Sequence, residues 1–344
     1  MSSPRSRALR LSVGLAISAV FLVATLSRVD LGEVGRALQQ LDLRLLLVAV
    51  PLVFVELVLR GLRWQRLLEP IAEISLGRSV AYLSIGYFAN SMLPARLGDI
   101  ARAFLAGRAL GVSRLGVIGT VVVERAADGL FILGLVAVLG VLVAGGGSLA
   151  TTAAWLVALA AVGAGGLVVA IAWIRSSGAG AIRVTLRSLV ERLLRGAEGL
   201  RSPTGLVIVV ALTVVAFVPA VAMFALIADA AGVELTIAQC ALVMGGLALS
   251  TSIPAAPGSI GTYEFVGLTI LTTLGIGPDV ALAIVVVVHL VATLPVALAG
   301  LLASWHLHFR VGDIAEDAEP SNLVAEEPDA PRPKLERSAR PTDS

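Results

Sequence analysis

The sequence predicts an all-α polytopic membrane protein with about six full spans and two re-entrant, broken-helix hairpins that form an inverted repeat. The 344-residue chain is 57% hydrophobic and only 15% charged, whereas a soluble domain carries about 25% charge. Several uncharged runs exceed the ~18 residues that indicate a membrane span. Two further apolar segments are interrupted by proline and glycine, which a simple spanning helix does not require.

The first half of the chain is expected to cross the membrane three times, at about residues 11–27, 43–60 and 117–143. The N-terminus has the basic start of a signal peptide, but its apolar run of about 17 residues is longer than usual, so we interpret it as a retained span. Arginines before this span place the N-terminus in the cytoplasm. Arginine clusters flank the segment at about 79–105, so this segment should enter and leave from the cytoplasm.

The second half is expected to add three spans, at about residues 151–174, 204–228 and 279–305. The arginine-rich segment at about 175–201 predicts an amphipathic helix on the cytoplasmic membrane surface, with an ordinary basic loop as the alternative. The segment at about 238–276 should start and end outside, and the last span then returns the C-terminus to the cytoplasm.

Residues 1–310 are predicted to form one transmembrane domain, followed by a cytoplasmic tail at 311–344. The tail lacks aromatic residues and is rich in Pro, Asp, Glu and Arg, so it is expected to be disordered. The single cysteine, Cys240, excludes an internal disulfide and a cysteine-based metal site. No ATP-binding phosphate loop and no hydrolase or metalloprotease motif occurs. We therefore expect no cofactor, no bound metal, no nucleic-acid partner and no enzymatic activity.

The two interrupted segments resemble each other. "NSMLPARLGDIA" and "STSIPAAPGSIG" align at a constant offset of 160 residues (254 − 94), so that Pro94 meets Pro254 and Gly98 meets Gly258. The first copy enters from the cytoplasm and the second from outside, and such pairs are typical of inverted-repeat transporters with a substrate site near the midplane. The residues expected to shape the hairpins are Pro94, Gly98, Pro254 and Pro257.

Each break places glycine and proline ahead of a new helical run. Free backbone N–H groups and the positive end of a helix dipole would then face a cavity, which favours an anion. We expect Gly258 and Gly261 to let a phosphate approach the backbone closely, and Tyr263 to hydrogen-bond a headgroup. The alternative for the tyrosine is an ordinary interface anchor.

Charged residues gather at two places in or beside the membrane segments. In "PARLGDIARAF" they recur every third residue, which places them on one helical face, and in "VVVERAADGLF" they lie inside the third expected span. Charges inside a membrane helix are costly, so they normally pair and face the interior of the bundle. The six residues are Arg96, Asp99, Arg102, Glu124, Arg125 and Asp128.

Two interpretations of these charges stay open, and both can hold at once. One is a structural ion-pair lattice, in which arginines of the first block pair with carboxylates of the span. In the other, Arg96, Arg102 and Arg125 bind an anionic group. The counter-ions or proton carriers would then be Glu124, Asp128 or Glu264.

Other polar residues carry a simpler expectation. Arg60, Arg63 and Trp64 in "RGLRWQRLL" are interpreted as an anchor at the inner membrane interface, with Glu56 one turn earlier to neutralise Arg60. His289 is alone in an apolar span, and we expect a buried, hydrogen-bonded histidine rather than a proton relay.

Four blocks together resemble one family, the lysylphosphatidylglycerol synthase transmembrane region, which includes stand-alone flippase-like domains. The blocks are "RGLRW", "NSMLPARLGDIAR", "ERAAD" and "PAAPGSIGTYE", the last with Ser259 where glycine is common. The resemblance covers about residues 5–310 and implies lipid translocation in a bacterial inner membrane. We expect no aminoacyl-transferase domain here, so lysine transfer is not carried over.

The first functional hypothesis is a lipid transporter or flippase that moves an anionic phospholipid or a lipid-linked precursor across the bacterial cytoplasmic membrane. The alternative is a non-transporting scaffold or accessory subunit that partners a lipid-modifying enzyme or a glycosyltransferase. A membrane-embedded enzyme would need a catalytic base near the arginines, and no reaction-specific motif supports one. The candidate substrate-binding residues are Asn90, Arg96, Asp99, Arg102, Glu124, Arg125, Asp128, Gly258, Gly261, Tyr263 and Glu264.

Overall fold

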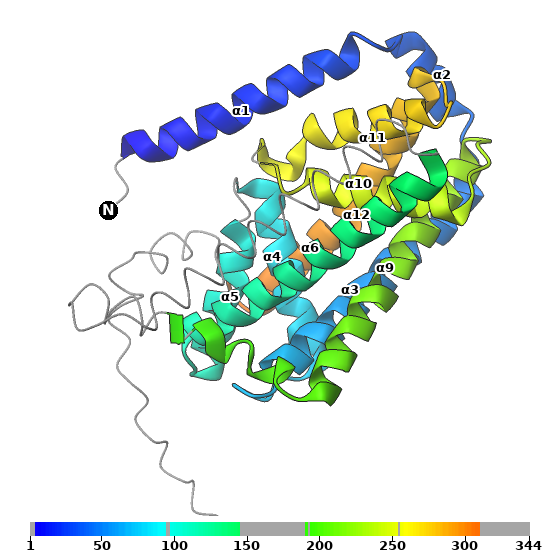
Figure 1. Cartoon of the computed structure of the whole chain (residues 1–344). Coiled ribbons are helices and arrows are strands. Elements are labelled where there is room, and N and C mark those ends of the chain that lie inside the picture. Colours follow the sequence, from blue (N-terminus) through cyan, green and yellow to red (C-terminus); the bar gives the residue numbers. More distant parts are fainter. Residues whose placement is uncertain (1–3, 94–96, 145–189, 192, 254, 310–344) are drawn as a thin grey trace, which may run out of the picture.

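The computed structural model describes residues 4–93, 97–144, 190–191, 193–253 and 255–309. Within these ranges every regular element is a helix, which confirms the all-α prediction there (Figure 1). The α-helices are α1 (Pro4–Leu26), α2 (Leu31–Gln39), α3 (Leu43–Leu68), α4 (Leu76–Met92), α5 (Leu97–Leu110), α6 (Arg114–Ala144), α9 (Pro203–Ala230), α10 (Ile237–Ser250), α11 (Thr262–Thr273) and α12 (Pro278–His306), and the short 3-10 turns are η2 (Glu198–Leu200) and η3 (Pro257–Ser259).

Four of the described helices, α3, α6, α9 and α12, are long and apolar enough to cross a membrane. The bent pair of α1 and α2, which meet at 81°, brings the number of spans to as many as five. The chain is therefore a multi-pass membrane protein. The expected span at 151–174 and most of the basic segment at 175–201 lie outside the described residues, so the expected number of six spans is not confirmed.

The first predicted interruption is a break between α4 and α5. The backbone of Leu93, at the end of α4, is extended (φ −110°, ψ 141°), so the helix cannot continue into the next residue. Pro94 and Arg96 lie in the break itself, outside the described residues. The predicted helix–break–helix arrangement is confirmed by the helices on either side.

The second predicted interruption separates α10 from α11 and contains η3. Gly258 and Gly261 have positive φ angles of 72° and 92°, a conformation that is costly for other residues. Pro257 begins η3, while Pro254 is outside the described residues. This break is also confirmed, whereas the opposite orientation of the two hairpins in the membrane stays a prediction.

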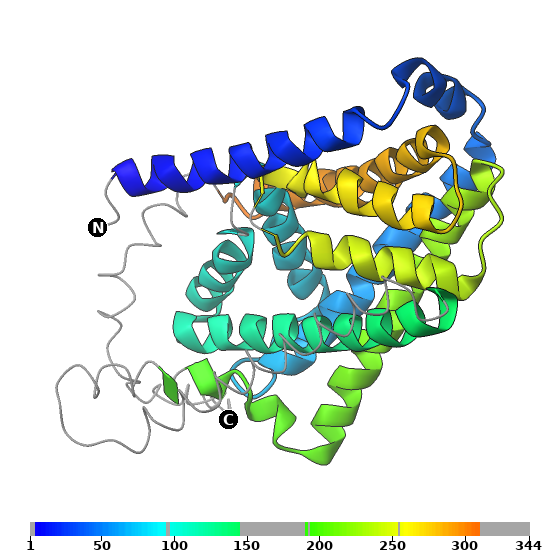
Figure 2. The ribbon, with the colours of Figure 1, turned by 45° about the horizontal axis from the view of Figure 1, so that its top comes forward.

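The two hairpins meet in space although they are far apart in the sequence (Figure 2). α4 of the first hairpin packs against α5, against α12 and against η3, the turn inside the second hairpin. α11 of the second hairpin also packs against α12, and α6 contacts both α5 and α10. These contacts bring the helices of the two hairpins together around α12.

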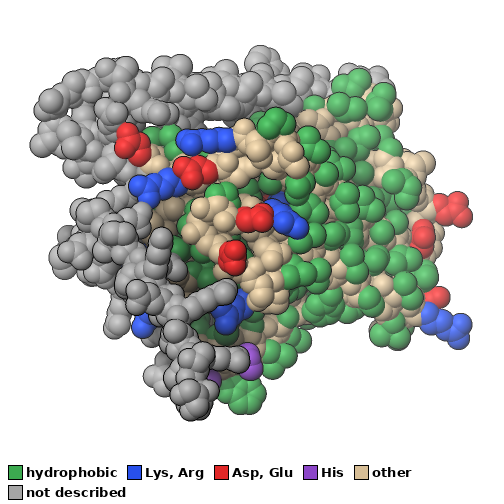
Figure 3. Space-filling model, turned by 90° about the horizontal axis from the view of Figure 1, so that it is seen from below, with side chains coloured by type: hydrophobic (Ala, Val, Ile, Leu, Met, Phe, Trp, Pro, Cys, Tyr) green, Lys and Arg blue, Asp and Glu red, His purple; other side chains and the backbone are tan. Residues whose placement is uncertain are grey.

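Outside this interior the molecule is apolar. α3, α6, α9 and α12 all expose large aliphatic side chains, as expected for surfaces that face lipid. α1 lies along the outside of the second hairpin and packs against α11 (Figures 1 and 2). Figure 3 shows one largely hydrophobic face of the molecule with acidic and basic side chains gathered near its middle.

Candidate functional site

A cavity of about 490 Å³ lies between the two hairpins. α4 contributes Asn90 and Ser91 to its wall, the second break contributes Ser252 and Gly258, and α12 contributes His289. α9 and α10 line it with apolar side chains. The charged groups of the wall come from α3, α5 and α6 and are Glu56, Arg60, Asp99, Arg125 and Asp128.

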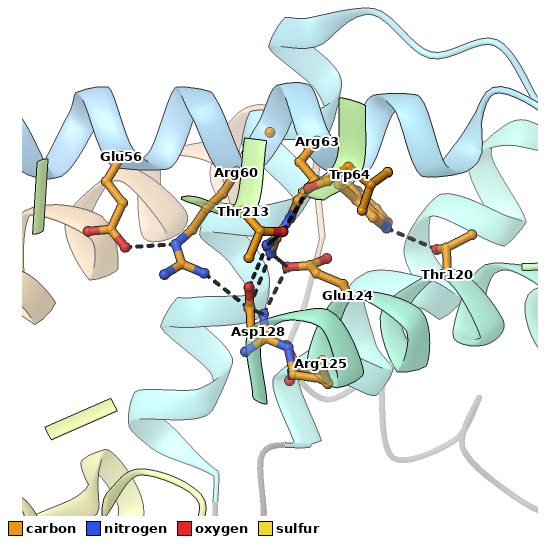
Figure 4. A network of polar contacts seen from close by, with 12 residues as sticks. Glu56, Arg60, Arg63, Trp64, Thr120, Glu124, Arg125, Asp128 and Thr213 are labelled. Carbon is orange, nitrogen blue, oxygen red and sulfur yellow. Dashed lines mark hydrogen bonds and ion pairs between the residues drawn. The ribbon is translucent and has the colours of Figure 1, made fainter. Parts of the chain in front are cut away.

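The charges on α3 pair with those on α6 (Figure 4). Arg63 donates to Glu124 over 3.1 Å between Nη2 and Oε1, and its Nη1 also contacts Asp128. Arg60 donates to Asp128 over 3.3 Å from Nη1 and to Glu56 over 2.7 Å from Nε. The side chains of Arg63 and Glu124 are both 0% exposed. A chain of ion pairs therefore crosses the protein interior from one helix to the other.

α5 joins the same network from the other side. Arg102 Nη2 lies 3.0 Å from Glu124 Oε2, and Arg102 Nε lies 3.6 Å from Asp99 Oδ1. Arg125 lies within 4 Å of three carboxylates: 2.8 Å from Glu124, 3.5 Å from Asp128 and 3.9 Å from Asp99. The lattice foreseen in the sequence, with arginines of the first block facing carboxylates of the span, is present for Arg102 and Glu124.

The network among the described residues is charge-balanced. Its four arginines, at 60, 63, 102 and 125, face four carboxylates, at 56, 99, 124 and 128. Four of the buried guanidinium nitrogens have no hydrogen-bond partner there: Nε of Arg63, Nε and Nη1 of Arg102, and Nε of Arg125. The cluster therefore cancels its own charge without using all of its donors.

The interface-anchor interpretation of the "RGLRW" block is wrong. Arg63 and Trp64 are each 0% exposed, because α3 continues to Leu68 and carries this block into the bundle. The indole Nε1 of Trp64 donates to the hydroxyl of Thr120 over 3.1 Å, and the guanidinium of Arg102 lies 5.0 Å from the ring centroid. Trp64 thus forms a wall of the charge network rather than a contact with lipid headgroups.

At the second hairpin, the expected free N–H site is already occupied. The backbone N–H of Gly261, at the start of α11, donates to Glu264 Oε2 over 2.6 Å. A carboxylate of the same helix therefore caps the end that was expected to receive a phosphate. The other oxygen, Oε1, lies 2.6 Å from His289 Nδ1, and His289 Nε2 lies 2.9 Å from the carbonyl oxygen of Gly258. Tyr263 stacks on this histidine with ring centroids 4.3 Å apart.

The hairpin glycines differ in their surroundings. A Cβ on Gly98 would collide with the carbonyl of Gly86 and lie 2.7 Å from Asn90 Oδ1, the atom that accepts the N–H of Gly98 over 2.8 Å. A Cβ on Gly261 would lie 2.5 Å from the carbonyl oxygen of Ser18 on α1. Gly98 and Gly261 are therefore sites of close helix packing. Of these three glycines only Gly258 lines the cavity, and a Cβ there would meet no backbone atom, only Ile260 Cγ1 at 3.9 Å, which corrects the expectation that both Gly258 and Gly261 admit a phosphate.

Some functional candidates reach the cavity and others lie behind it. The candidates that line the cavity are Asn90, Asp99, Arg125, Asp128, Gly258 and Tyr263. Three others contact lining residues from behind: Arg102, Glu124 and Glu264. Arg96 lies outside the described residues. The sequence interpretation missed the central place of Arg60, Arg63 and His289. The spacing of Glu56, Arg60 and Arg63, one turn apart on one face, was the signal that could have placed two of them inside the bundle.

The chain matches a known protein family. A family model described as "Lysylphosphatidylglycerol synthase TM region" matches residues 11–300, which include every described residue of the cavity wall. In a search of curated proteins, none matches this chain.

Proposed function

The chain belongs to the lysylphosphatidylglycerol synthase transmembrane-region family, and on that premise we propose that it is a lipid transporter. It takes the anionic headgroup of a phospholipid, or of a lipid-linked precursor, into the cavity between the hairpins while the acyl chains stay in the surrounding lipid. It works in a bacterial cytoplasmic membrane, with both termini in the cytoplasm according to the arginine distribution.

The observation that carries this proposal is a charged cavity inside an apolar bundle, walled by two broken hairpins. Irregular backbone at membrane depth is tolerated where it is buried in protein or lines a water-filled space. Transporters with paired broken helices bind their substrates at such places. The residue types in the wall are those that hold a polar headgroup: two arginines, an asparagine, serines and two tyrosines.

Arg60 and Arg125 are the natural partners for a phosphate. Their side chains are 19% and 28% exposed, in contrast to Arg63 and Arg102, which are buried behind them. Guanidinium groups bind phosphate oxygens in a bidentate manner. Both arginines already contact carboxylates, so a phosphate must compete for them, and its binding is correspondingly weak. Weak binding suits a carrier, which has to release its substrate on the far side.

The proposal is tested with purified protein in liposomes that contain a fluorescently labelled anionic phospholipid. Wild-type protein should make the label in the inner leaflet accessible to an added reductant faster than protein-free liposomes do. Arg125→Gln should slow this movement about tenfold or more, because the cavity loses a phosphate-binding charge. Arg66→Gln is the matched control, since Arg66 is 48% exposed and pairs only with Glu69 among the described residues.

Lipid movement no faster than in empty liposomes, with folded protein present, would reject transport. The scaffold hypothesis would then take its place, and co-purification with a lipid-modifying enzyme or a glycosyltransferase would be the next measurement. If wild type, Arg125→Gln and the control move lipid at equal rates, transport is supported but Arg125 does not bind the headgroup.

A further inference from the structure

His289 lies between two groups that accept hydrogen bonds. On one side, Nε2 is 2.9 Å from the backbone carbonyl oxygen of Gly258. A carbonyl oxygen has no proton to donate, so Nε2 must carry the hydrogen of this bond. On the other side, Nδ1 is 2.6 Å from Oε1 of Glu264. The carboxyl group of Glu264 is in turn fixed by its Oε2, which accepts the N–H of Gly261 over 2.6 Å.

Only two distributions of protons satisfy both contacts of the ring. Either His289 is an imidazolium that donates from both nitrogens to Gly258 and to an ionised Glu264, or neutral His289 donates to Gly258 and accepts from a protonated Glu264. A neutral ring beside an ionised carboxylate would place two lone pairs 2.6 Å apart. Both satisfactory states hold one proton more than that repulsive state.

We propose that His289 and Glu264 together form a proton-binding site in the cavity wall, and that the bound proton ties the second hairpin to α12. We also expect binding and release of this proton to be coupled to lipid movement, and that part rests on the proposed transport function. The proton-binding site itself rests only on the geometry of the pair.

The other charged groups around this cavity balance one another. The charged or titratable side chains that line the same cavity are Glu56 and Arg60 on α3, Tyr87 on α4, Asp99 on α5, Arg125 and Asp128 on α6, and Tyr263 on α11. With Arg63, Arg102 and Glu124 directly behind them, these groups amount to four arginines and four carboxylates, so they set no net charge against a proton on the pair. Arg28 lies beyond α11, with its guanidinium 5.1 Å from the ring centroid of Phe265.

Loss of the proton has a structural consequence. The pair would keep a single donor for two acceptors, so either the carbonyl of Gly258 or the carboxylate of Glu264 would lose its bond to α12. The first loss frees the turn that contains Gly258, and the second frees the residue that caps α11. A Cβ on Gly258 would meet only Ile260 Cγ1, at 3.9 Å, and its φ of 72° is one that glycine adopts readily, so no close packing at this position holds the turn once it is released.

The proton site is tested by spectroscopy that does not depend on transport. The chain has three histidines, so His306→Gln with His308→Asn leaves His289 as the only imidazole. In this protein, labelled with ¹⁵N-histidine and placed in lipid nanodiscs at pH 7, we expect one of two results. Either both ring nitrogens are protonated, or one is protonated and infrared spectroscopy shows a protonated carboxyl band that Glu264→Gln removes. A neutral ring beside an ionised Glu264 would overturn the proposal.

The coupling is tested in liposomes with an imposed pH gradient. Wild-type lipid movement should change about fivefold or more with the direction of the gradient. In His289→Gln the amide cannot take up the proton that the imidazole shares with Glu264, so this variant should move lipid at a rate independent of the gradient. A wild-type rate that ignores the gradient would overturn the coupling. If no lipid moves in any liposome, the proposed transport function fails, while the spectroscopic result still decides whether the pair binds a proton.

Discussion

Glu124 is the residue on which the charge network depends. Its two carboxylate oxygens accept from Arg63, Arg102 and Arg125 at 2.8–3.1 Å, and its side chain is 0% exposed. Neither water nor lipid headgroups reach this carboxylate, so the three guanidinium groups have no substitute for its charge. Buried ion pairs of this kind add little net stability, but removing one partner leaves the other charge unpaired.

We therefore expect Glu124→Gln to lower the stability of the protein by about 3–5 kcal/mol. The amide keeps the shape of the side chain but leaves the arginines with one negative charge fewer. The measurement is the melting temperature in detergent, compared with Glu33→Gln, which breaks an ion pair between side chains that are 46% and 65% exposed. Such surface pairs contribute about 0–1 kcal/mol, so the control should melt almost like wild type. Equal melting temperatures for the two variants would show that the buried network does not hold the bundle together.

At the scale of elements, α1 is attached to the second hairpin by three contacts. Its Ser18 hydroxyl accepts the backbone N–H of Ala256, in the second break, over 2.8 Å. Phe21 lies against Phe265 of α11 with ring centroids 4.9 Å apart. The close approach of Gly261 to the carbonyl of Ser18 adds a third contact. α1 therefore holds the second hairpin from the lipid side while His289 holds it from the cavity side.

Removing the hydroxyl should loosen this attachment. Ser18→Ala leaves the N–H of Ala256 without its partner, which costs about 1 kcal/mol and shifts the opening equilibrium of the break about fivefold. The measurement is the labelling rate of a cysteine placed at Ser252 in a Cys240→Ser background. Ser27→Ala is the control, because the hydroxyl of Ser27 bonds to the carbonyl of Ala24 at the exposed end of the same helix. Unchanged labelling in Ser18→Ala would mean that α1 does not restrain the break.

The elements also show what local sequence can predict. The two breaks were predictable because proline and glycine act on the backbone at their own positions. The end of α3 was not predictable in this way, because the apolar run of the sequence stops at Arg60 whereas the helix continues to Leu68. Arg60 and Arg63 in this last part are compatible with the interior only because α6 supplies the carboxylates of Glu124 and Asp128 from elsewhere in the chain. The contact between Glu264 and His289, which lie on different helices, depends on helix packing in the same way.

At the scale of the whole molecule, the offset of 160 residues predicts that two distant segments are copies of each other; both segments contain a break between helices, and the inverted repeat itself stays a prediction. The chain brings them together around α12, with α4 against η3. The sequence could not show that the helices of both hairpins line one common cavity, because that depends on tertiary contacts between the halves. Ser91 of the first hairpin and Ser252 of the second both line this cavity.

This arrangement leads to a prediction that separates a carrier from a scaffold. In a Cys240→Ser background, a cysteine at Ser91 or at Ser252 reports from which side a membrane-impermeant thiol reagent enters the cavity. A carrier has to open the cavity alternately to the two sides, so each cysteine should be labelled from either face of sealed vesicles, and addition of lipid substrate should change both rates together. A cysteine at Ser27, exposed at the end of α1, is the control and should be labelled from one face only. Labelling of both cavity positions from a single face under all conditions would contradict alternating access, because a cavity that never changes sides cannot carry a headgroup across the membrane.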